Sequence, residues 1–416
     1  MPSESDIIQA LQMDFFHAAQ AINGSGDPAF TITYRFEDST PEDDITGRTG
    51  WSTWSTQERA AVHAALDHIE SFLNVDFVVA KTGTDADLSL GLVTQPVGIA
   101  GYGGAELWTH GDGSVFSYDG FATYDKSLDL TREFNLILHE LGHALGLEHP
   151  FEGTVLDPAY DSNHYTVMSY ASDPESGTDS DAMMVYDILA LQDIWGAAEH
   201  NTGNNTYTGP RTDTADTIWD TGGTDTFDAS ARTGAVRLDL RDGAFSSFGS
   251  FEDVAIAFGV TIENAVGGAG ADWLTGNRAD NVLIGNAGGD LIKGKSGTDV
   301  LSGGRGGDKL KGGSDADLLK GGPGRDKLIG GIGSDTLQGD GGADVFVFHD
   351  GADMDVIRDF EPGTDSIAFI GHGGLSGILA VAAEIDGDVV FDLGGGDILV
   401  VAGVTLGALE NDLFVG

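Results

Sequence analysis

From Gly267 onward the sequence repeats with a period of nine residues, and this period limits the fold more than any other feature. Nine consecutive units fill residues 267–347, each with a glycine-rich turn, Asp or Asn at its sixth position and a large apolar residue at its eighth. Such a unit is long enough for a six-residue turn and a three-residue strand, which is half of a flattened coil. We therefore expect two units to close one coil, and units two apart to stack as parallel strands about 4.8 Å apart.

The sixth position predicts a column of oxygen ligands along each edge of the coil. Calcium binds oxygen at about 2.3–2.6 Å, so an ion between stacked carboxylates can reach both of them. Asn281 is neutral, and we expect weaker binding at the first coil. The repeat resembles the calcium-binding nonapeptide of parallel β-helices. The predicted calcium ligands are Asp272, Asp290, Asp299, Asp308, Asp317, Asp326, Asp335 and Asp344.

The charge of the chain favours cations as partners. The 416 residues carry 67 acidic and 20 basic side chains, a formal net charge of −47. Nucleic acid and anionic membrane surfaces are therefore unfavourable partners. The chain has no cysteine, which excludes disulfides and thiolate metal sites. No apolar run is long enough to insert into a membrane, and the N-terminus lacks the pattern of a secretory signal.

The stretch "LILHELGHALGLEHPF" predicts a metal site at the end of a buried helix over residues 130–146. His139 and His143 are four residues apart and share a helix face, where both can bind one ion. Gly146 can end the helix and turn the chain, so that His149 supplies a third nitrogen. Three histidines leave one zinc position open, as catalytic sites do, and Glu140 is placed to act as a general base.

The first 200 residues have the pattern of a mixed α+β domain. Alternating residues predict strands over 30–36, 75–80 and 86–93, and the glycine-rich segment 98–104 is expected to be an exposed edge strand. Ser55 and Glu58 have the spacing of a capping box before a helix. A further amphipathic helix is expected over 181–197. His164 is interpreted as a solvated loop residue, and His63 and His68 as surface or half-buried residues.

The motif H-E-x-x-H-x-x-G-x-x-H is the metzincin signature, and with "YTVMSY" and the nonapeptides it resembles the serralysins, secreted zinc proteases that depend on calcium. The resemblance implies that Met168 lies beneath the histidines. It implies that Tyr170 binds the resting zinc and later steadies the oxyanion. It also implies one-step (type I) secretion from a Gram-negative bacterium. The fold class expected is an α+β metzincin-like catalytic domain followed by an all-β domain with a parallel β-roll.

The expected domains are a protease domain over 1–200, with a propeptide or N-terminal helix over about 1–25, and a calcium-binding domain over 201–416. The expected function is extracellular proteolysis by a monomer with one Zn²⁺ and several Ca²⁺. Two alternatives stay open. One is a calcium-dependent binding or matrix protein whose zinc domain does not cut; the other is a metal-dependent hydrolase of a non-protein substrate.

Overall fold

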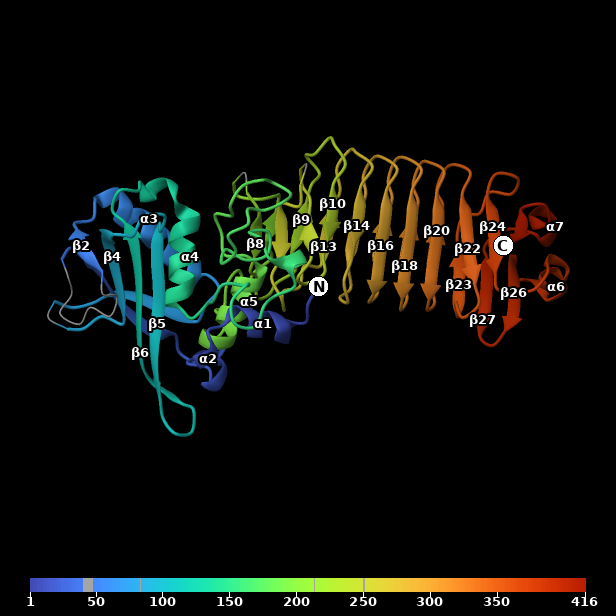
Figure 1. Cartoon of the computed structure of the whole chain (residues 1–416). Helices are drawn as coiled ribbons and strands as arrows, with labels where there is room; N and C mark the ends of the chain where they lie inside the picture. The colour runs from blue at the N-terminus through green and yellow to red at the C-terminus, as the bar shows by residue number, and fades with distance from the viewer. Residues whose placement is uncertain (40–47, 83, 213, 250) are drawn as a thin grey trace. The chain divides into compact units, whose positions relative to one another are not determined.

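The computed structural model describes residues 1–39, 48–82, 84–212, 214–249 and 251–416 (Figure 1). Two compact units are present within it. The first comprises residues 1–202 and 210–221, and the second comprises residues 203–209 and 222–416. Each unit is described by itself.

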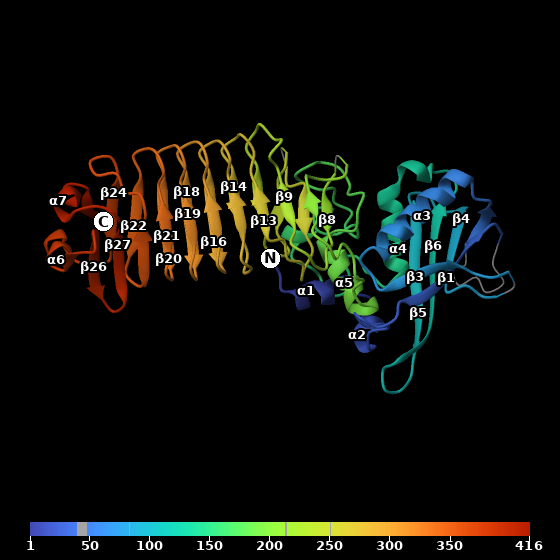
Figure 2. The same ribbon diagram turned by 180° about the vertical axis from the view of Figure 1, so that it is seen from behind.

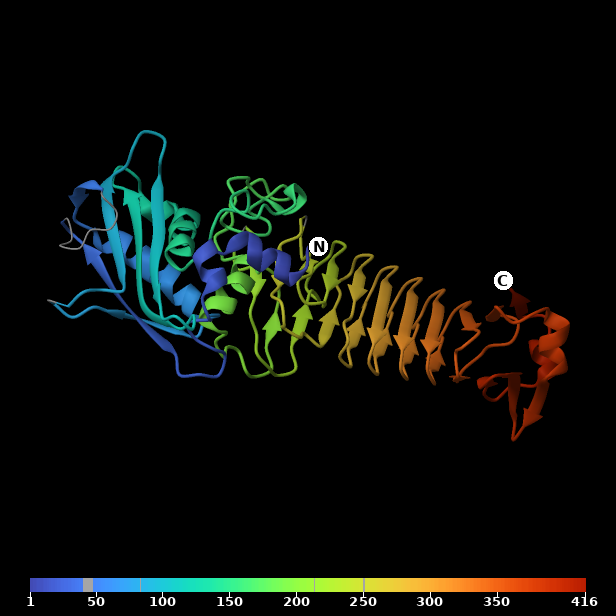
Figure 3. The same cartoon turned by 60° about the horizontal axis from the view of Figure 1, so that its bottom comes forward.

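The first unit is built on a six-stranded sheet with helices packed on it (Figure 3). The strand order is β3-β1-β4-β6-β5, with β2 paired to β4, so that β5 ends the path. Its neighbour β6 pairs with it antiparallel, whereas β3, β1, β4 and β6 run parallel. The strands are β1 (Phe30–Glu37), β2 (Thr49–Ser52), β3 (Val75–Val79), β4 (Leu88–Thr94), β5 (Gly101–Thr109) and β6 (Val115–Asp125). The expected strands and the edge position of the glycine-rich segment are confirmed.

The helices of this unit begin where side chains can satisfy their first backbone N–H groups. The capping box of Ser55 and Glu58 is present at the start of α3, as predicted. The helix α4, which carries His139 and His143, begins at Phe134 rather than at residue 130, because residues 130–132 form a separate 3-10 turn. The α-helices are α1 (Glu4–Leu11), α2 (Asp14–Ala18), α3 (Thr56–Glu70), α4 (Phe134–Ala144) and α5 (Val185–Trp195), and the 3-10 turns are Leu130–Arg132 and Pro158–Tyr160.

The second unit is a parallel β-roll, whose stacked coils are visible in Figures 1 and 2. Strands 18 residues apart pair in register, as Leu291 does with Lys309 and Leu318 with Thr336. Alternate strands form an eight-stranded sheet, β10-β14-β16-β18-β20-β22-β24-β28, and an eleven-stranded sheet, β25-β26-β27-β23-β21-β19-β17-β15-β13-β9-β7. The expected coil of two nonapeptide units is therefore confirmed.

The strands before and within the nonapeptides are two to six residues long, and the shortest strands within the nonapeptides occupy only the last three residues of a unit. Those before the nonapeptides are β7 (Thr206–Tyr207), β8 (Asp216–Ile218, in the first unit), β9 (Thr226–Asp228), β10 (Arg237–Asp239), β11 (Phe245–Ser246), β12 (Val254–Ile256) and β13 (Asn264–Val266). Those within the nonapeptides are β14 (Trp273–Thr275), β15 (Val282–Ile284), β16 (Leu291–Ser296), β17 (Val300–Ser302), β18 (Lys309–Ser314), β19 (Leu318–Lys320), β20 (Lys327–Ile332), β21 (Thr336–Gln338) and β22 (Val345–His349).

The chain beyond the nonapeptides closes the end of the roll. Its strands are β23 (Met354–Ile357), β24 (Ser366–Ile370), β25 (Ala382–Ile385), β26 (Asp388–Gly394), β27 (Asp397–Val401) and β28 (Leu413–Val415), and its helices are α6 (Leu375–Ala380) and α7 (Leu406–Leu409). No helix in the described part of the chain is both long and apolar enough to cross a membrane.

Each nonapeptide places its eighth residue inside the coil, where the side chains form one apolar column. All nine are at most 1 % exposed, from Leu274 to Phe346. Burying a leucine side chain stabilises a fold by about 1.5–3 kcal/mol, so this column is the main hydrophobic contribution of the repeats.

Lys295 occupies a backbone conformation that glycine adopts in neighbouring coils. Its φ is +96°, and Gly304, Gly313 and Gly322 have positive φ at the same position of their own repeats. A non-glycine residue there costs of order 1–3 kcal/mol. We therefore expect Lys295→Gly to stabilise the calcium-loaded protein by about 1 kcal/mol after the added chain entropy is subtracted.

Urea denaturation followed by circular dichroism tests this expectation. The matched control is Asp340→Gly at the equivalent position, where φ is +62° and an aspartate is tolerated. Equal effects of the two substitutions would contradict a conformational origin.

Candidate metal centres

The three motif histidines meet at the end of α4. His139 and His143 come from the helix and are 7 % exposed. His149 comes from the segment after it. Its Nε2 atom lies 3.1 Å from Nε2 of His143 and 3.3 Å from Nε2 of His139. Two nitrogens at about 2.05 Å from a tetrahedral ion are separated by about 3.3 Å, so the spacing fits zinc.

The other nitrogen of each ring faces an oxygen. His139 Nδ1 is 2.8 Å from the Val167 carbonyl, and His143 Nδ1 is 2.8 Å from the Leu147 carbonyl. His149 Nδ1 lies 3.3 Å from Glu152 Oε2. In the tautomer with the proton on Nδ1, the lone pairs of the three Nε2 atoms point at one another. Metal binding through Nε2 requires this tautomer.

Burial keeps two of these rings neutral. It lowers the pKa of His139 to about 4 and the pKa of His143 to about 3. Three converging lone pairs with no proton between them repel one another, and a cation at their centre removes that repulsion. The residues present therefore fit a zinc ion.

A glycine bends the chain between the second and third histidines, as the sequence predicts. Gly146 has a φ of +111°, and a Cβ at this residue would lie 2.5 Å from the ring of Phe16. A second glycine, Gly142, has the sulfur of Met168 against it, 2.7 Å from where a Cβ would stand. Met168 is fully buried, so it packs against the helix that carries the histidines.

Glu140 is buried beside the histidines on α4. It is 5 % exposed, and its Oε2 atom has no hydrogen-bond partner within the described residues. Burial raises the pKa of Glu140 to about 8, although a hydrogen bond from Gly103 and the charge of Arg48 oppose the shift. A carboxyl group tuned toward neutral pH is suited to accept and return a proton.

The edge strand β5 runs directly against this helix. A Cβ at Gly101 would lie 2.3 Å from Oε1 of Glu140, and a Cβ at Gly103 would lie 2.2 Å from its carbonyl oxygen. Glycine is required at both positions for the strand to come so close. Residues of β5, α4 and the segment 163–179 line one cleft of about 1080 Å³.

Tyr170 stands over the histidines at the open side of the cleft. Its side chain is 72 % exposed, and its ring centroid lies 5.7 Å from that of His139 and 4.8 Å from that of His149. Phe151 packs 5.1 Å from it. Because it is exposed, the ring has room to move relative to the histidines.

Asp187 was not singled out from the sequence, yet it holds the turn that contains Met168. It is fully buried in α5, and its carboxylate accepts from the Thr166 hydroxyl at 2.5 Å and from the N–H groups of Val167 and Met184 at 2.9 Å. The Val167 carbonyl in turn faces His139. Asp187 thus positions a histidine through one intervening residue, a relation that no local spacing in the sequence reveals.

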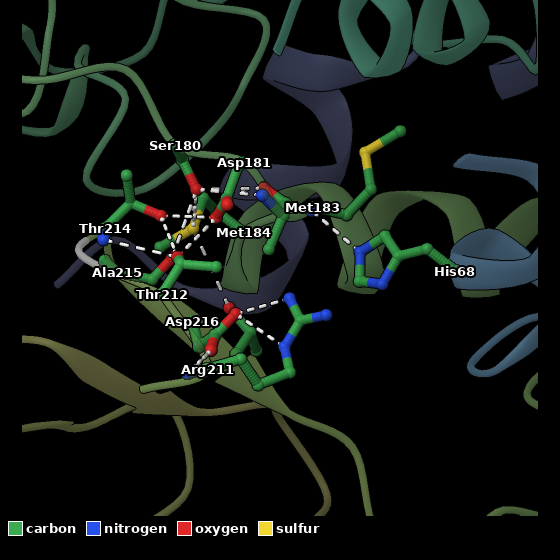
Figure 4. A network of polar contacts seen from close by, with 12 residues as sticks. His68, Ser180, Asp181, Met183, Met184, Arg211, Thr212, Thr214, Ala215 and Asp216 are labelled. Carbon is green, nitrogen blue, oxygen red and sulfur yellow. Dashed lines mark hydrogen bonds and ion pairs between the residues drawn. The ribbon is translucent and has the colours of Figure 1, made fainter. Parts of the chain in front are cut away.

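The segment before α5 is fixed by a polar network within the first unit (Figure 4). His68 Nε2 accepts from the Met183 N–H at 3.0 Å, and burial lowers the pKa of His68 to about 4, so it is a neutral acceptor. Thr212 donates to Asp181 at 3.0 Å. Arg211 pairs with Asp216 next to them. These contacts explain why α5 begins at Val185 instead of residue 181.

The interpretation of His164 as a solvated loop residue is wrong. His164 is 2 % exposed, and its Nδ1 lies 3.0 Å from Oδ1 of Asp173. Asp173 lies nine residues after His164, and its carboxylate gives the buried ring nitrogen a hydrogen-bond partner. This partner offsets the cost of burying the imidazole. His63 is exposed and His68 half-buried, as expected.

The sixth-position aspartates stack along both edges of the roll. The N–H of each donates to Oδ1 of the aspartate one coil further on, as from Asp290 to Asp308 at 2.8 Å and from Asp299 to Asp317 at 2.9 Å. The second oxygen, Oδ2, is buried and has no hydrogen-bond partner within the described residues at Asp290, Asp299, Asp308, Asp317, Asp326, Asp335 and Asp344.

These orphaned oxygens face backbone carbonyls across glycines. A Cβ at Gly285 would lie 2.3 Å from Oδ2 of Asp290 and 2.6 Å from the Gly303 carbonyl. The same arrangement recurs at Gly294, Gly303 and Gly312. A side chain at these glycines would fill the space between the carboxylate and carbonyl oxygens. A space lined by such oxygens fits calcium.

The first coil differs from the others. Oδ2 of Asp272 already accepts from the Gly268 N–H at 2.6 Å, and Oδ1 of Asn281 accepts from the Asn277 N–H at 2.9 Å. Fewer oxygens are left for an ion at this coil, which agrees with the weaker binding expected there.

The two columns continue beyond the nonapeptides. Oδ1 of Asp355 accepts from the Asp335 N–H at 3.0 Å, and Oδ1 of Asp365 accepts from the Asp344 N–H at 2.9 Å. The nonapeptide pattern predicts neither residue, because their spacings of 20 and 21 residues depart from the nine-residue register.

Comparison with known proteins points to one family. A family model described as "Peptidase M10 serralysin C terminal" matches residues 190–375. The chain is 33% identical over 298 residues to a serralysin of Photorhabdus luminescens, covering 61% of this chain and 60% of that protein. Over these stretches the chain is similar to the serralysins.

Two other relatives carry similar names. The metallopeptidase AprA of Pseudomonas marginalis is 32% identical over 309 residues, covering 64% of each protein. A serralysin of Proteus mirabilis is 40% identical over 178 residues, covering 35% of this chain and 36% of that protein. The chain thus spans 60% of the length of the Photorhabdus luminescens serralysin and 64% of the length of the Pseudomonas marginalis AprA.

Asp187→Asn should loosen the histidine site of this protein without unfolding the chain. An amide cannot accept all three hydrogen bonds, which costs about 1–3 kcal/mol, and lost support of a ligand typically weakens metal binding about 10–100-fold. Zinc competition with a chromophoric chelator measures the affinity. The control is Asp193→Asn in the same helix, where the aspartate accepts from Gln12 alone among the described residues. Equal affinities for wild type and Asp187→Asn would contradict the positioning role.

Without calcium, the roll should be more stable in acid than at neutral pH. Burial and neighbouring carboxylates raise the pKa of Asp290 to about 6 and those of Asp299, Asp326 and Asp335 to about 7. A raised folded pKa favours the protonated native state, so its stabilisation is complete below the unfolded value and is lost as pH rises through about 6 to 7. Thermal denaturation in a chelator at pH 5 and pH 8 tests this, and a higher midpoint at pH 8 would contradict it.

Proposed function

We propose that this protein is a secreted zinc endopeptidase whose calcium-wound β-roll stabilises it outside the cell. The observation that carries the proposal is the convergence of three histidine Nε2 atoms beside the buried Glu140, in a cleft bordered by an unpaired strand edge. The relationship to the serralysins supports the same chemistry.

His139, His143 and His149 would hold the zinc ion through their Nε2 atoms. A zinc ion held there supplies a Lewis acid that polarises the scissile carbonyl and acidifies a water molecule. All three histidines line the cleft, and the Nδ1 side of each ring is turned toward a protein oxygen, so the Nε2 atoms are left to hold the ion.

Glu140 accepts a proton from the attacking water and returns it to the leaving amine. Its buried position excludes bulk water and holds its pKa near the range in which both transfers are possible. The Tyr170 hydroxyl donates a hydrogen bond to the developing oxyanion, for which its exposed ring has the necessary freedom.

The substrate binds as an added strand along β5. This strand ends the path of the sheet, and its residues 101–106 line the cleft next to Glu140. An unpaired edge offers backbone N–H and C=O groups to an extended peptide, so recognition depends mainly on the peptide backbone.

The second unit takes up calcium through the stacked aspartates. Extracellular calcium modules bind in about the 10⁻⁴–10⁻³ M range, so the roll would stay unwound in calcium-poor cytosol and fold after export. We propose export in one step through a type I channel of a Gram-negative bacterium. We also assign catalysis to residues 1–200 and calcium binding to residues 201–416. Residues 1–25 include α1, whose Ile7 and Leu11 are buried, which supports an N-terminal helix over a propeptide.

Replacement of the general base tests the enzymatic proposal. Glu140→Gln should reduce casein hydrolysis about 10²–10⁴-fold while zinc stays bound, because the amide cannot accept the proton. Glu199→Gln, at an exposed position, is the control and should keep full activity.

The outcome also separates the alternatives. If wild type with zinc and calcium bound does not cleave casein, the enzymatic proposal fails and a calcium-dependent binding or matrix protein is favoured. Turnover of an ester or other non-peptide substrate without peptide cleavage would instead favour a different hydrolase.

A further inference from the structure

A cluster of metal-binding side chains lies far along the chain from the motif histidines. Asp350 follows β22, His372 lies two residues after β24, and Asp397 begins β27. One potential ligand atom from each residue lies within 4.8 Å of the others. The two strands β22 and β24 belong to one sheet of the roll and β27 to the other, so the cluster spans both sheets.

Strand pairing holds two of the residues next to each other. His349 pairs with Ile370 at the end of β22 and β24, and the Asp350 N–H donates to the Ile370 carbonyl at 3.2 Å. The third residue is fixed by backbone donors. Asp397 Oδ2 accepts from the Gly351 N–H at 3.0 Å, and its Oδ1 accepts from the Asp353 N–H at 3.3 Å.

The ring of His372 packs between two phenylalanines and has one buried nitrogen without a partner in the described residues. The ring stacks on Phe348 with centroids 5.4 Å apart and planes 20° apart, and Phe369 meets it edge-on. Its Nε2 atom is buried without a hydrogen-bond partner, and neither ring nitrogen is paired with any residue in the described part of the chain. A buried polar atom with no partner costs about 1–3 kcal/mol, and a bound ion would offset that cost.

We propose that Asp350, His372 and Asp397 form a second transition-metal site, which binds a zinc-like divalent cation. Two carboxylates and a neutral imidazole balance the charge of such an ion. Calcium is unsuitable here because it prefers six to eight oxygen ligands, whereas imidazole nitrogen is a ligand of zinc, nickel and copper. The ligand atoms, which lie within 4.8 Å of one another, would close to about 3.3 Å around a tetrahedral ion, and the exposed side chain of Asp350 permits this movement.

The ion would fasten the two sheets at the C-terminal end of the roll. Neither the histidine centre nor the stacked aspartates contributes a ligand, so the site is independent of the proposed peptidase activity. Its effect would be on the stability of this end of the unit.

Anomalous scattering at the zinc edge tests the inference directly. The full chain is loaded with excess Ca²⁺ and then with Zn²⁺, and we expect one anomalous peak among the motif histidines and another among Asp350, His372 and Asp397. In solution we expect about two tightly bound zinc ions per chain, one for each three-ligand centre.

Two variants show which residues bind the second zinc ion. His372→Phe keeps the ring that stacks on Phe348 and removes both nitrogens, so it should lose one zinc per chain while casein hydrolysis stays at the wild-type rate. His349→Phe is the matched control one residue before Asp350 and should keep both equivalents. Zinc should also raise the melting temperature of calcium-loaded wild type above that of His372→Phe.

The outcomes are separable from those of the proposed function. A peak at the motif histidines alone, or a second equivalent retained by His372→Phe, would overturn this inference and leave the peptidase proposal intact. A peak at His372 with none at the motif histidines would support this inference and contradict the peptidase proposal. Circular dichroism of each variant in calcium verifies that the roll is folded.

Discussion

Repulsion between like charges is the constraint on which the second unit depends. The parallel ladder repeats every 18 residues and therefore places one buried carboxylate directly after another along each edge. From Asp290 to Asp344, hydrogen bonds from the backbone satisfy only one oxygen of each carboxylate, and the other is left without a partner in the described residues. Such a column is unfavourable when ionised, and cations between the coils convert the repulsion into attraction. The apolar column contributes stability but cannot by itself remove this cost.

The first unit solves a similar problem in a smaller space. Two imidazoles and a carboxyl group are buried in a helix whose other buried positions are apolar, and a third imidazole follows the helix in the chain. Each ring has a protein oxygen near its Nδ1 atom, and these oxygens come from the turn after Tyr165, the segment after the helix, and Glu152. Asp187 fixes the first of these oxygens from a different helix. The geometry of the histidines thus depends on residues distant in the sequence.

Regular spacing made much of this fold predictable from sequence. The period of nine fixes the coil, its register and the aspartate columns, and the spacing of His139, His143 and Gly146 fixes a bent helix end. The extension of the columns through Asp355 and Asp365 was missed because the period changes there. The burial of His164, the support by Asp187 and the cluster around His372 were also out of reach. Each depends on a tertiary contact between elements that have no common spacing.

The nearest-neighbour contacts of the roll have a consequence for its length. Each coil bonds to the coil before it and the coil after it, and the same three-residue strands and glycine turns recur at every interface. Removing or duplicating 18 residues would restore identical surfaces at the join. The array is therefore modular, and its size can change by whole coils while the closing segment at the end is preserved.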